Sequence, residues 1–446
     1  MERLPAIEGR IVLDEPGRRA ASRDFGRGAA PLPLAVAQPA TVDDVVSLVR
    51  FARAEGLPLA ARGQAHTTAG QALAPGGVLL DMRSLCAVHT VDQESTLVDA
   101  GARWRTVLDA TLPAGLAPPT LTDYQELTVG GTLSVGGVGG EAHRAGAQVD
   151  NVLALDVVTG AGDLVTCSPT EEPDLFWACL GGLGQTAILC RARLRLAPAP
   201  ATVRSFYLKY DTLAAFLGDL GALAAERRFP HLYGNITAQP KGGWDLELVA
   251  TCDAGEGRAI DRAALLHGLS ARPGAIEERP SSYRDFTNRV DAAAEAMKAA
   301  GLWDVPHPWL DLFVPAPSAE AFIAAELARL DVTTLGHGGI LLYPLERTSH
   351  RAPCFALPAT DRCFLFDVFR NALPPTPEHA AALVTDNRRA YERCRDLGGT
   401  LYPIGSTPMS PSDWEAHFGA GFAHLQRAKQ RFDPGRILTP GPGVFG

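Results

Sequence analysis

Arg62-Gly-Gln-Ala-His66-Thr-Thr-Ala-Gly-Gln71 is the stretch of sequence from which the fold is best argued. It follows a short apolar segment, 57–61, and precedes another, 78–82, and we expect both segments to be strands. A glycine-containing loop between strands can turn its backbone amides toward a negatively charged group. The imidazole of His66 could serve there as a nucleophile, a base or a ligand, although a turn with a solvated histidine has the same pattern. The loop alone therefore predicts an anion site and leaves the role of its histidine open.

The segments around this loop alternate between helix and strand. Thr41 is a typical helix cap, and apolar residues at 45, 48, 49 and 52 follow it at helical spacing until Gly56. A third strand is expected at 96–100, a helix at 104–112, a hairpin over 152–167 and a half-buried strand over 188–196. Pro198-Ala-Pro200 marks a domain boundary, and one amphipathic helix is expected over 412–432. These elements predict an α+β protein.

A second glycine-rich segment, Thr128-Val-Gly-Gly-Thr-Leu-Ser-Val-Gly-Gly-Val-Gly-Gly140, offers backbone amides and hydroxyls to a pyrophosphate. It lacks the context of the Rossmann fingerprint, in which the glycines follow a strand and open a helix, so we expect a loop. Leu180-Gly-Gly-Leu-Gly-Gln185 adds a third glycine cluster. A tightly packed loop without a ligand remains the alternative for each cluster.

Asp123 lies immediately upstream, between a proline-rich turn and the glycine-rich segment. A carboxylate in a dry cavity is suited to removing an N–H or O–H proton while a hydride leaves the neighbouring carbon. Asp123 could equally cap a turn. The sequence around it therefore leaves both roles open.

Size and charge limit the class of protein. A chain of 446 residues is too long for one core, so we expect two domains, and 46% hydrophobic with 20% charged residues is typical of a globular protein. The net charge of −9 argues against nonspecific binding to nucleic acid or to an anionic membrane surface. We therefore expect neither nucleic acid nor membrane as a partner.

The cysteines and the apolar segments indicate a cytoplasmic location. The eight cysteines include no C-x-x-C pair, and we expect them to be reduced and mostly buried. No signal peptide and no apolar run of membrane-spanning length is apparent. The sequon at Asn235 would matter only in a secreted protein.

Several runs together resemble the cytokinin dehydrogenases, which belong to the covalent-FAD oxidoreductases related to vanillyl-alcohol oxidase. The resemblance covers about residues 33 to 446. The matching runs are Gly63-x-x-His66 continuing through Gly70-Gln-Ala to Gly77, Thr122-Asp-Tyr-x-x-Leu-Thr-Val-Gly-Gly-Thr-Leu-Ser134, Leu180-Gly-Gly-Leu-Gly-Gln185, Gly301-Leu-Trp303 with Val305-Pro-His-Pro-Trp-Leu310, and Ser412-Asp-Trp414.

The resemblance implies a two-domain fold of the FAD-binding PCMH or vanillyl-alcohol oxidase type. An FAD-binding domain would span 1–197, and an inserted substrate domain with an antiparallel sheet covered by helices would span 198–400. Residues 401–446 would return to complete the FAD-binding domain.

The resemblance also implies roles for individual residues. His66 would bear the covalent bond to FAD, and Asp123 would be the catalytic base. Other residues match positions that contact FAD in the family: Gly63, Gln64, Ala65, Thr67, Gln71, Thr128, Ser134, Val138, Leu189 and Thr439. Trp303 and Trp309 are candidate walls of a substrate pocket, or ordinary core residues. No metal site is expected.

The implied reaction is oxidation of an N6-substituted adenine, a cytokinin, by hydride transfer to flavin. The resulting imine would hydrolyse to adenine and an aldehyde, and a quinone-like compound or O2 would accept the electrons. The family's plant members carry an acidic pair where this chain has Ala293 and Ala294. An oxidase of the same fold acting on another amine, an alcohol or a sugar, and a flavin-binding protein without turnover, are therefore the alternatives. The sequence leaves the oligomeric state open.

Overall fold

The helix expected after Thr41 is present in the computed structural model, which describes residues 4–28, 31–255 and 260–446. Helix α2 spans Val42–Glu55, and Thr41 and Asp44 form a capping box at its start. Gly56 ends the helix in the left-handed conformation, which a residue without Cβ adopts without strain. The predicted apolar positions face a buried cluster, so the spacing identified the correct face.

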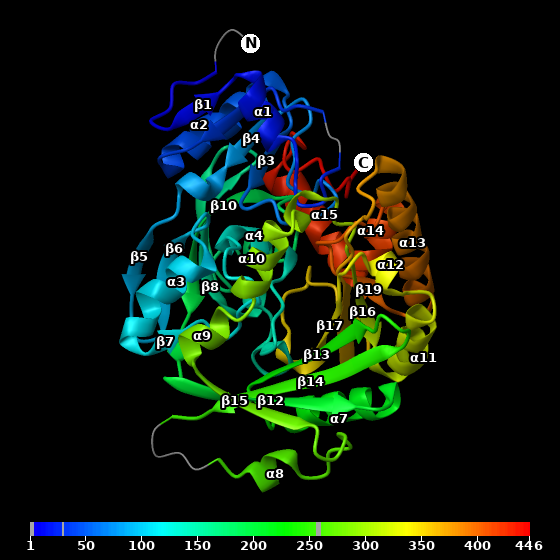
Figure 1. Cartoon of the computed structure of the whole chain (residues 1–446). Helices are drawn as coiled ribbons and strands as arrows, with labels where there is room; N and C mark the ends of the chain where they lie inside the picture. The colour runs from blue at the N-terminus through cyan, green and yellow to red at the C-terminus, as the bar shows by residue number, and fades with distance from the viewer. Residues whose placement is uncertain (1–3, 29–30, 256–259) are drawn as a thin grey trace.

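Two sheets organise the first half of the chain (Figure 1). The 4-stranded sheet has the order β1-β2-β4-β3, and its strands β2, β3 and β4 run parallel. The 5-stranded sheet is antiparallel, with the order β5-β6-β10-β8-β9. The strands are β1 (Arg10–Val12), β2 (Ala35–Gln38), β3 (Leu59–Arg62), β4 (Val78–Asp81), β5 (Val88–Val91), β6 (Ser95–Asp99), β8 (Val152–Thr159), β9 (Leu164–Cys167) and β10 (Ala187–Arg195). A short pair joins β7 (Leu116–Ala117) to β11 (Ala197–Pro198).

An 8-stranded antiparallel sheet dominates the second half, with the order β15-β12-β14-β13-β17-β18-β16-β19. Its strands are β12 (Thr202–Tyr210), β13 (His231–Ala238), β14 (Trp244–Asp253), β15 (Ile276–Ser282), β16 (Leu310–Pro315), β17 (Ile340–Glu346), β18 (Arg362–Val368) and β19 (Thr400–Leu401). Helices α7 (Leu213–Glu226), α11 (Ala316–Leu327) and α13 (Pro377–Asp396) pack against it. The predicted α+β class and the helix-covered antiparallel sheet are confirmed, whereas the domain bounds at 197 and 400 stay a prediction.

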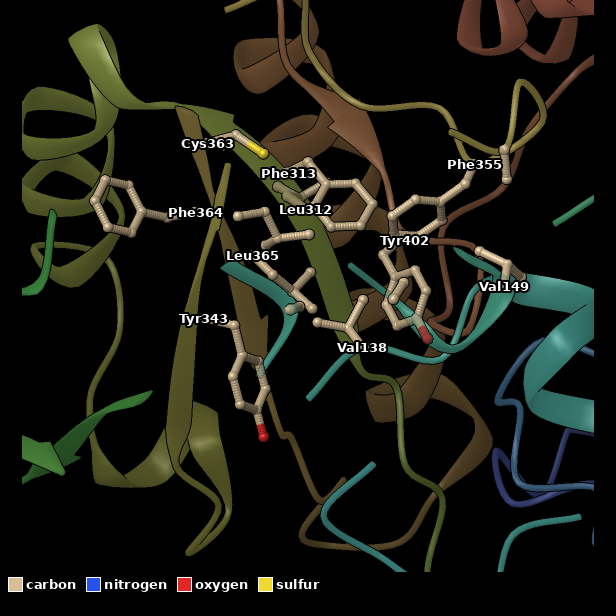
Figure 2. Close-up of a cluster of buried hydrophobic side chains, with 14 of the residues drawn as sticks. Val138, Val149, Leu312, Phe313, Tyr343, Phe355, Cys363, Phe364, Leu365 and Tyr402 are labelled. Atoms are coloured by element: carbon tan, nitrogen blue, oxygen red, sulfur yellow. The ribbon is translucent and has the colours of Figure 1, made fainter. Parts of the chain in front are cut away.

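Side chains of β18 alternate between the two faces of this sheet. Figure 2 shows Phe364 pointing to the opposite side of the strand from Leu365. Phe366 contacts Phe322 of α11, so the even-numbered residues face the covering helices. Leu365 and Asp367 therefore share the other face, which is turned toward the first half of the chain.

The remaining helices are short or connect the sheets. They are α1 (Glu15–Ala21), α3 (Trp104–Thr111), α4 (Val129–Val135), α5 (Ala142–Ala145), α6 (Pro173–Cys179), α8 (Arg262–Leu266), α9 (Tyr283–Thr287), α10 (Asp291–Ala299), α12 (Val332–Leu335), α14 (Pro411–Phe418) and α15 (Ala420–Phe432). None of the helices in the described ranges is long and apolar enough to span a membrane. All of the eight cysteines except Cys86 are buried, as expected.

The prediction of a loop over 128–140 was wrong for its first half, which forms helix α4. Val129 and Leu133 are fully buried on one face of this helix. A Cβ at Gly130 would lie 2.8 Å from the Cβ of Ala100, so this glycine permits the helix to pack against the chain before α3. Glycine density here reflects close packing rather than a loop.

The single helix expected over 412–432 is two helices, α14 and α15, separated at Gly419. Gly419 has φ 49° and ψ −122°, a conformation that residues with a side chain rarely adopt. Apolar spacing continues through the break, with Trp414, Phe418 and Leu425 all buried. The hydrophobic period therefore could not reveal the interruption.

The end of the chain returns to the first half (Figure 1). Helix α15 there contacts α6. The amide of Leu59 donates to the carbonyl of Ile437, and the amide of Thr439 donates to the carbonyl of Leu59. A buried ion pair between Lys429 and Asp433, at 2.8 Å, fixes the turn before this segment. Asp433 also accepts hydrogen bonds from two backbone amides of the returning segment.

Replacing Lys429 with Met should destabilise the protein, because it leaves the carboxylate of Asp433 buried without its cation. Loss of one partner from such a pair lowers the free energy of unfolding by about 3–5 kcal/mol. Urea unfolding at neutral pH measures the change. Arg279→Met is the control, since Arg279 pairs with Glu277 on an exposed surface. An equal, small effect of both substitutions would contradict the expectation.

Candidate active site

A cavity lies between the first half of the chain and the free face of the 8-stranded sheet. Strand β10, helix α4 and the loop after β3 form one side, and β17, β18 and Trp309, which precedes β16, form the other. Nearly all of the residues singled out from the sequence line it: Gly63, Gln64, Ala65, His66, Thr67, Gln71, Asp123, Thr128, Ser134, Val138, Leu189, Trp309 and Thr439. Residues distant in sequence thus meet at one site.

The loop Gly63–Thr67 presents polar groups that have no protein partner. Its five backbone amides find no acceptor among the residues that the structure describes. Ala65 adopts the left-handed conformation with φ 51°, and the Thr67 hydroxyl is buried without a hydrogen-bond partner. Successive amides around a left-handed residue form a concavity that binds anions. The geometry agrees with the expected anion site.

Helix α4 contributes less to such a site than its sequence suggests. The amides of Val129 and Gly130 donate to the carbonyls of Ala102 and Ala100, and the Ser134 hydroxyl donates to the Gly130 carbonyl. These groups were expected to face a pyrophosphate, but they are satisfied within the protein. The unpartnered backbone amides described above therefore belong to the loop that contains His66 and not to the first residues of α4.

His66 is enclosed by aromatic side chains. Phe25 stacks on it with ring centroids 4.3 Å apart, and His307 stacks on the other face of Phe25 at 4.0 Å. Burial, with a smaller contribution from His307, lowers the pKa of His66 to about 3. The imidazole is therefore neutral at physiological pH, and one ring nitrogen keeps a free lone pair.

Trp309 and Trp303 lie on different sides of His66. Trp309 lines the cavity with Asp123, and its ring centroid is 5.4 Å from that of His66. Trp303 lines an adjacent hollow with Phe25 and Lys298, and its centroid is 6.0 Å from that of His66. The structure thus places only Trp309 in the cavity that contains Asp123.

Asp123 is held by a cation that the sequence did not indicate. Arg289, from the segment between α9 and α10, forms an ion pair with its carboxylate. The same guanidinium donates to Nε2 of His231 at 3.1 Å, which is possible because burial lowers the pKa of His231 and keeps its ring neutral. The Arg289 side chain also covers the ring of Phe286. Arg289 therefore fixes the orientation of the carboxylate toward the cavity.

Two more carboxyl groups meet at the cavity wall. Asp367 on β18 stands opposite Asp311 on β16, and both are almost completely buried. Burial raises the pKa of Asp311 to about 8, and burial together with Asp311 raises the pKa of Asp367 well above its usual value. The pair therefore keeps protons at neutral pH that the unfolded chain has lost.

This raised pKa predicts a loss of stability as the pH rises. An aspartate in the unfolded chain ionises near pH 4, whereas Asp311 in the folded protein ionises at about 8. Between these values stability should fall by up to about 1.4 kcal/mol per pH unit for the proton retained. Urea midpoints from pH 5 to 8 measure the slope, which should be smaller in Asp311→Asn. Identical slopes would refute a shared proton in the native state.

Comparisons with known proteins agree with this geometry. A family model described as "Cytokinin dehydrogenase 1, FAD and cytokinin binding" matches residues 235–445, and one described as "FAD binding domain" matches residues 33–168. Cytokinin dehydrogenases 6 and 7 of Oryza sativa subsp. japonica are each 36% identical to the chain, covering 99% of it and 92% of their own length. The chain belongs to the cytokinin dehydrogenase family. It is also 41% identical to an uncharacterised oxidoreductase of the fasciation locus of Rhodococcoides fascians, over 94% of this chain and 95% of that protein.

As a member of the cytokinin dehydrogenase family, the chain is an FAD-linked oxidoreductase acting on CH–NH groups. The cavity fits that cofactor. The free amides of the His66 loop and the Thr67 hydroxyl are donors suited to a pyrophosphate, and apolar residues such as Val138 and Leu189 suit a flat ring system. No group of metal ligands occurs among the described residues.

Several residues of the site were not found from the sequence. Phe25 precedes the region of family resemblance, and Arg289 and Asp367 lie far along the chain from the segments they contact. No local pattern marks such residues, because the fold alone brings them to the cavity. Tyr343, which also lines the cavity, was missed because an aromatic residue in a strand is normally assigned to the core.

Proposed function

We propose that this protein oxidises the side chain of an N6-substituted adenine, a cytokinin, with FAD covalently held through His66. The observation that carries the proposal is the presence of Asp123 and His66 in one cavity, each held in place by buried neighbours. The names of the rice relatives support the substrate class. The 36% identity over nearly the whole chain makes a common reaction the simplest inference.

In this proposal Asp123 accepts a hydrogen bond from the side-chain N–H of the substrate and takes its proton. Arg289 keeps the carboxylate in one orientation, so the acceptor oxygen is in place before the substrate arrives. Bound FAD supplies the acceptor for the hydride that leaves the adjacent carbon. Trp309 and the apolar strand residues exclude water until oxidation is complete. The imine product then hydrolyses to adenine and an aldehyde.

Covalent attachment of FAD is the second part of the proposal. The low pKa of His66 leaves its imidazole neutral, and a neutral imidazole is the nucleophilic form. Phe25 restricts rotation of the ring by stacking on it, and His307 supports Phe25 by stacking on its other face. Ala65, which precedes this histidine, adopts the left-handed conformation although it carries a methyl group, and the loop forms around it.

Which substrate of the class is bound depends on positions 293 and 294, where this chain lacks the acidic pair of the plant members. Ala293 is exposed on α10, and Ala294 lines the hollow beside Trp303 rather than the cavity of Asp123. This placement favours neither loss nor retention of adenine binding. Another amine, an alcohol or a sugar thus remains the second candidate substrate, and a quinone-like compound or O2 is the proposed electron acceptor.

Anaerobic addition of isopentenyladenine to the purified flavoprotein tests the proposal. We expect the absorbance of oxidised flavin to bleach and one equivalent of adenine to appear. Bleaching by other amines, alcohols or sugars, with none by isopentenyladenine, would establish the second candidate. A spectrum that stays oxidised with every compound would show a flavin-binding protein without turnover.

A further inference from the structure

The wall of the cavity that the 8-stranded sheet forms contains one carboxyl group among apolar and aromatic side chains. Leu341 and Tyr343 of β17 face the cavity, as do Leu365 and Asp367 of β18. Their alternation follows from the strand period, and Figure 2 shows Tyr343 and Leu365 among the apolar residues on this side. The register pairs Leu341 with Asp367. A carboxyl group is thus inserted into a surface suited to a flat apolar ligand.

Asp367 is 4% exposed and Asp311, its neighbour in register on β16, is 0% exposed. Asp311 and Asp367 hydrogen-bond to each other through a retained proton, and no other donor in the described part of the chain reaches either oxygen of Asp311 or Oδ1 of Asp367. A buried polar group without a partner destabilises a protein unless something else satisfies it. The hydrogen bond within the pair uses only part of its capacity, and Asp367, which lines the cavity, can offer the rest to a bound molecule.

The pair can offer both kinds of hydrogen bond. Repulsion and burial keep at least one proton on the two carboxyl groups, so that one oxygen can donate while another accepts. A carboxyl group with one proton matches an N–H donor next to a ring-nitrogen acceptor, because both hydrogen bonds then form in one plane. A metal ion is a poorer match, since no third ligand accompanies the pair among the described residues.

We infer that Asp367, supported by Asp311, binds the part of the substrate that presents an N–H group beside an unprotonated ring nitrogen, as N9–H beside N3 of adenine does. The inference rests on the proposed function and adds a second contact to the purine, at an edge that Asp123 does not bind. Asp367 is the binding residue, and Asp311 is a positioning residue that shares its proton. Leu341 and Trp309 lie on the same face and enclose the ring.

This inference is tested without turnover by measuring the affinities of the oxidised holoenzyme for adenine and for 9-methyladenine. The change in flavin absorbance on binding is the signal. The methyl group removes the N–H donor and leaves the rest of the ring unchanged. One lost hydrogen bond to a buried carboxyl group corresponds to about 1.5–3 kcal/mol, so wild type should bind adenine about 10- to 100-fold more tightly. In Asp367→Leu the two affinities should agree within about threefold, because the remaining contacts are apolar.

Asp367→Asn is the matched variant, since an amide also has a donor and an acceptor and should keep the preference for adenine. Unchanged flavin absorption and thermal midpoint show that each variant is folded. Equal affinities in wild type, or a preference that survives in Asp367→Leu, would overturn the inference. Failure of the proposed function is recognised separately, because isopentenyladenine would then leave the flavin of wild type oxidised while the adenine preference stays measurable.

Discussion

Asp123→Asn should lower the rate of flavin reduction by isopentenyladenine by about 10²- to 10⁴-fold, the usual contribution of a general base. The substitution is isosteric, and the amide oxygen can still accept from Arg289, so the side chain should keep its place. What is removed is the ability to take a proton. Anaerobic stopped-flow measurement of flavin bleaching gives the rate of this step directly. Binding of adenine should change far less than the rate.

Asp413→Asn is a suitable control for this prediction. Asp413 also forms an ion pair with an arginine, Arg388, but it lies on α14 and does not line the cavity. Its replacement should leave the rate of bleaching close to that of wild type. If Asp123→Asn reduced flavin within fivefold of the wild-type rate, another group would have to be the base.

His66→Ala should abolish covalent attachment of the flavin. After acid precipitation of wild type the yellow colour should stay in the pellet, whereas in the variant any flavin should pass into the supernatant. The reason is that the neutral imidazole is the proposed nucleophile in the cavity, and alanine has no replacement for it. The absorption spectra of the pellet and supernatant measure the effect, which should be close to complete.

His307→Ala distinguishes the nucleophile from a general effect of the aromatic stack. His307 packs on the opposite face of Phe25 and is also buried, but it does not line the cavity. Its pellet should remain yellow. A yellow pellet from His66→Ala, or a colourless pellet from wild type, would exclude His66 as the point of attachment.

Local patterns were sufficient for much of the first half of the chain. The cap at Thr41 and the spacing after it located α2, and alternation over 188–196 located β10, because each pattern is set by one element and one buried face. Glycine was ambiguous. At Gly130 it permits a helix to pack closely and at Gly419 it separates two helices, and sequence alone does not distinguish these uses.

The residues of the candidate site also differ in whether the sequence alone could identify them. Residues in the motifs around His66 and Asp123 meet in one cavity, as the resemblance implied, although their individual roles stay predictions. Arg289 and the pair of Asp311 and Asp367 could not be found in this way. Their significance depends on contacts between strands and loops more than a hundred residues apart or on register within the large sheet, and neither leaves a periodic signal.

The return of the last residues has a consequence for how the protein is made. Thr439 lines the cavity, and its backbone carbonyl accepts a hydrogen bond from the side-chain amide of Gln185. During synthesis this segment follows Gln185 by 254 residues. A nascent chain therefore cannot complete the lining of the cavity until residue 439 has left the ribosome, and the cofactor chamber forms late relative to the glycine-rich segments that line it.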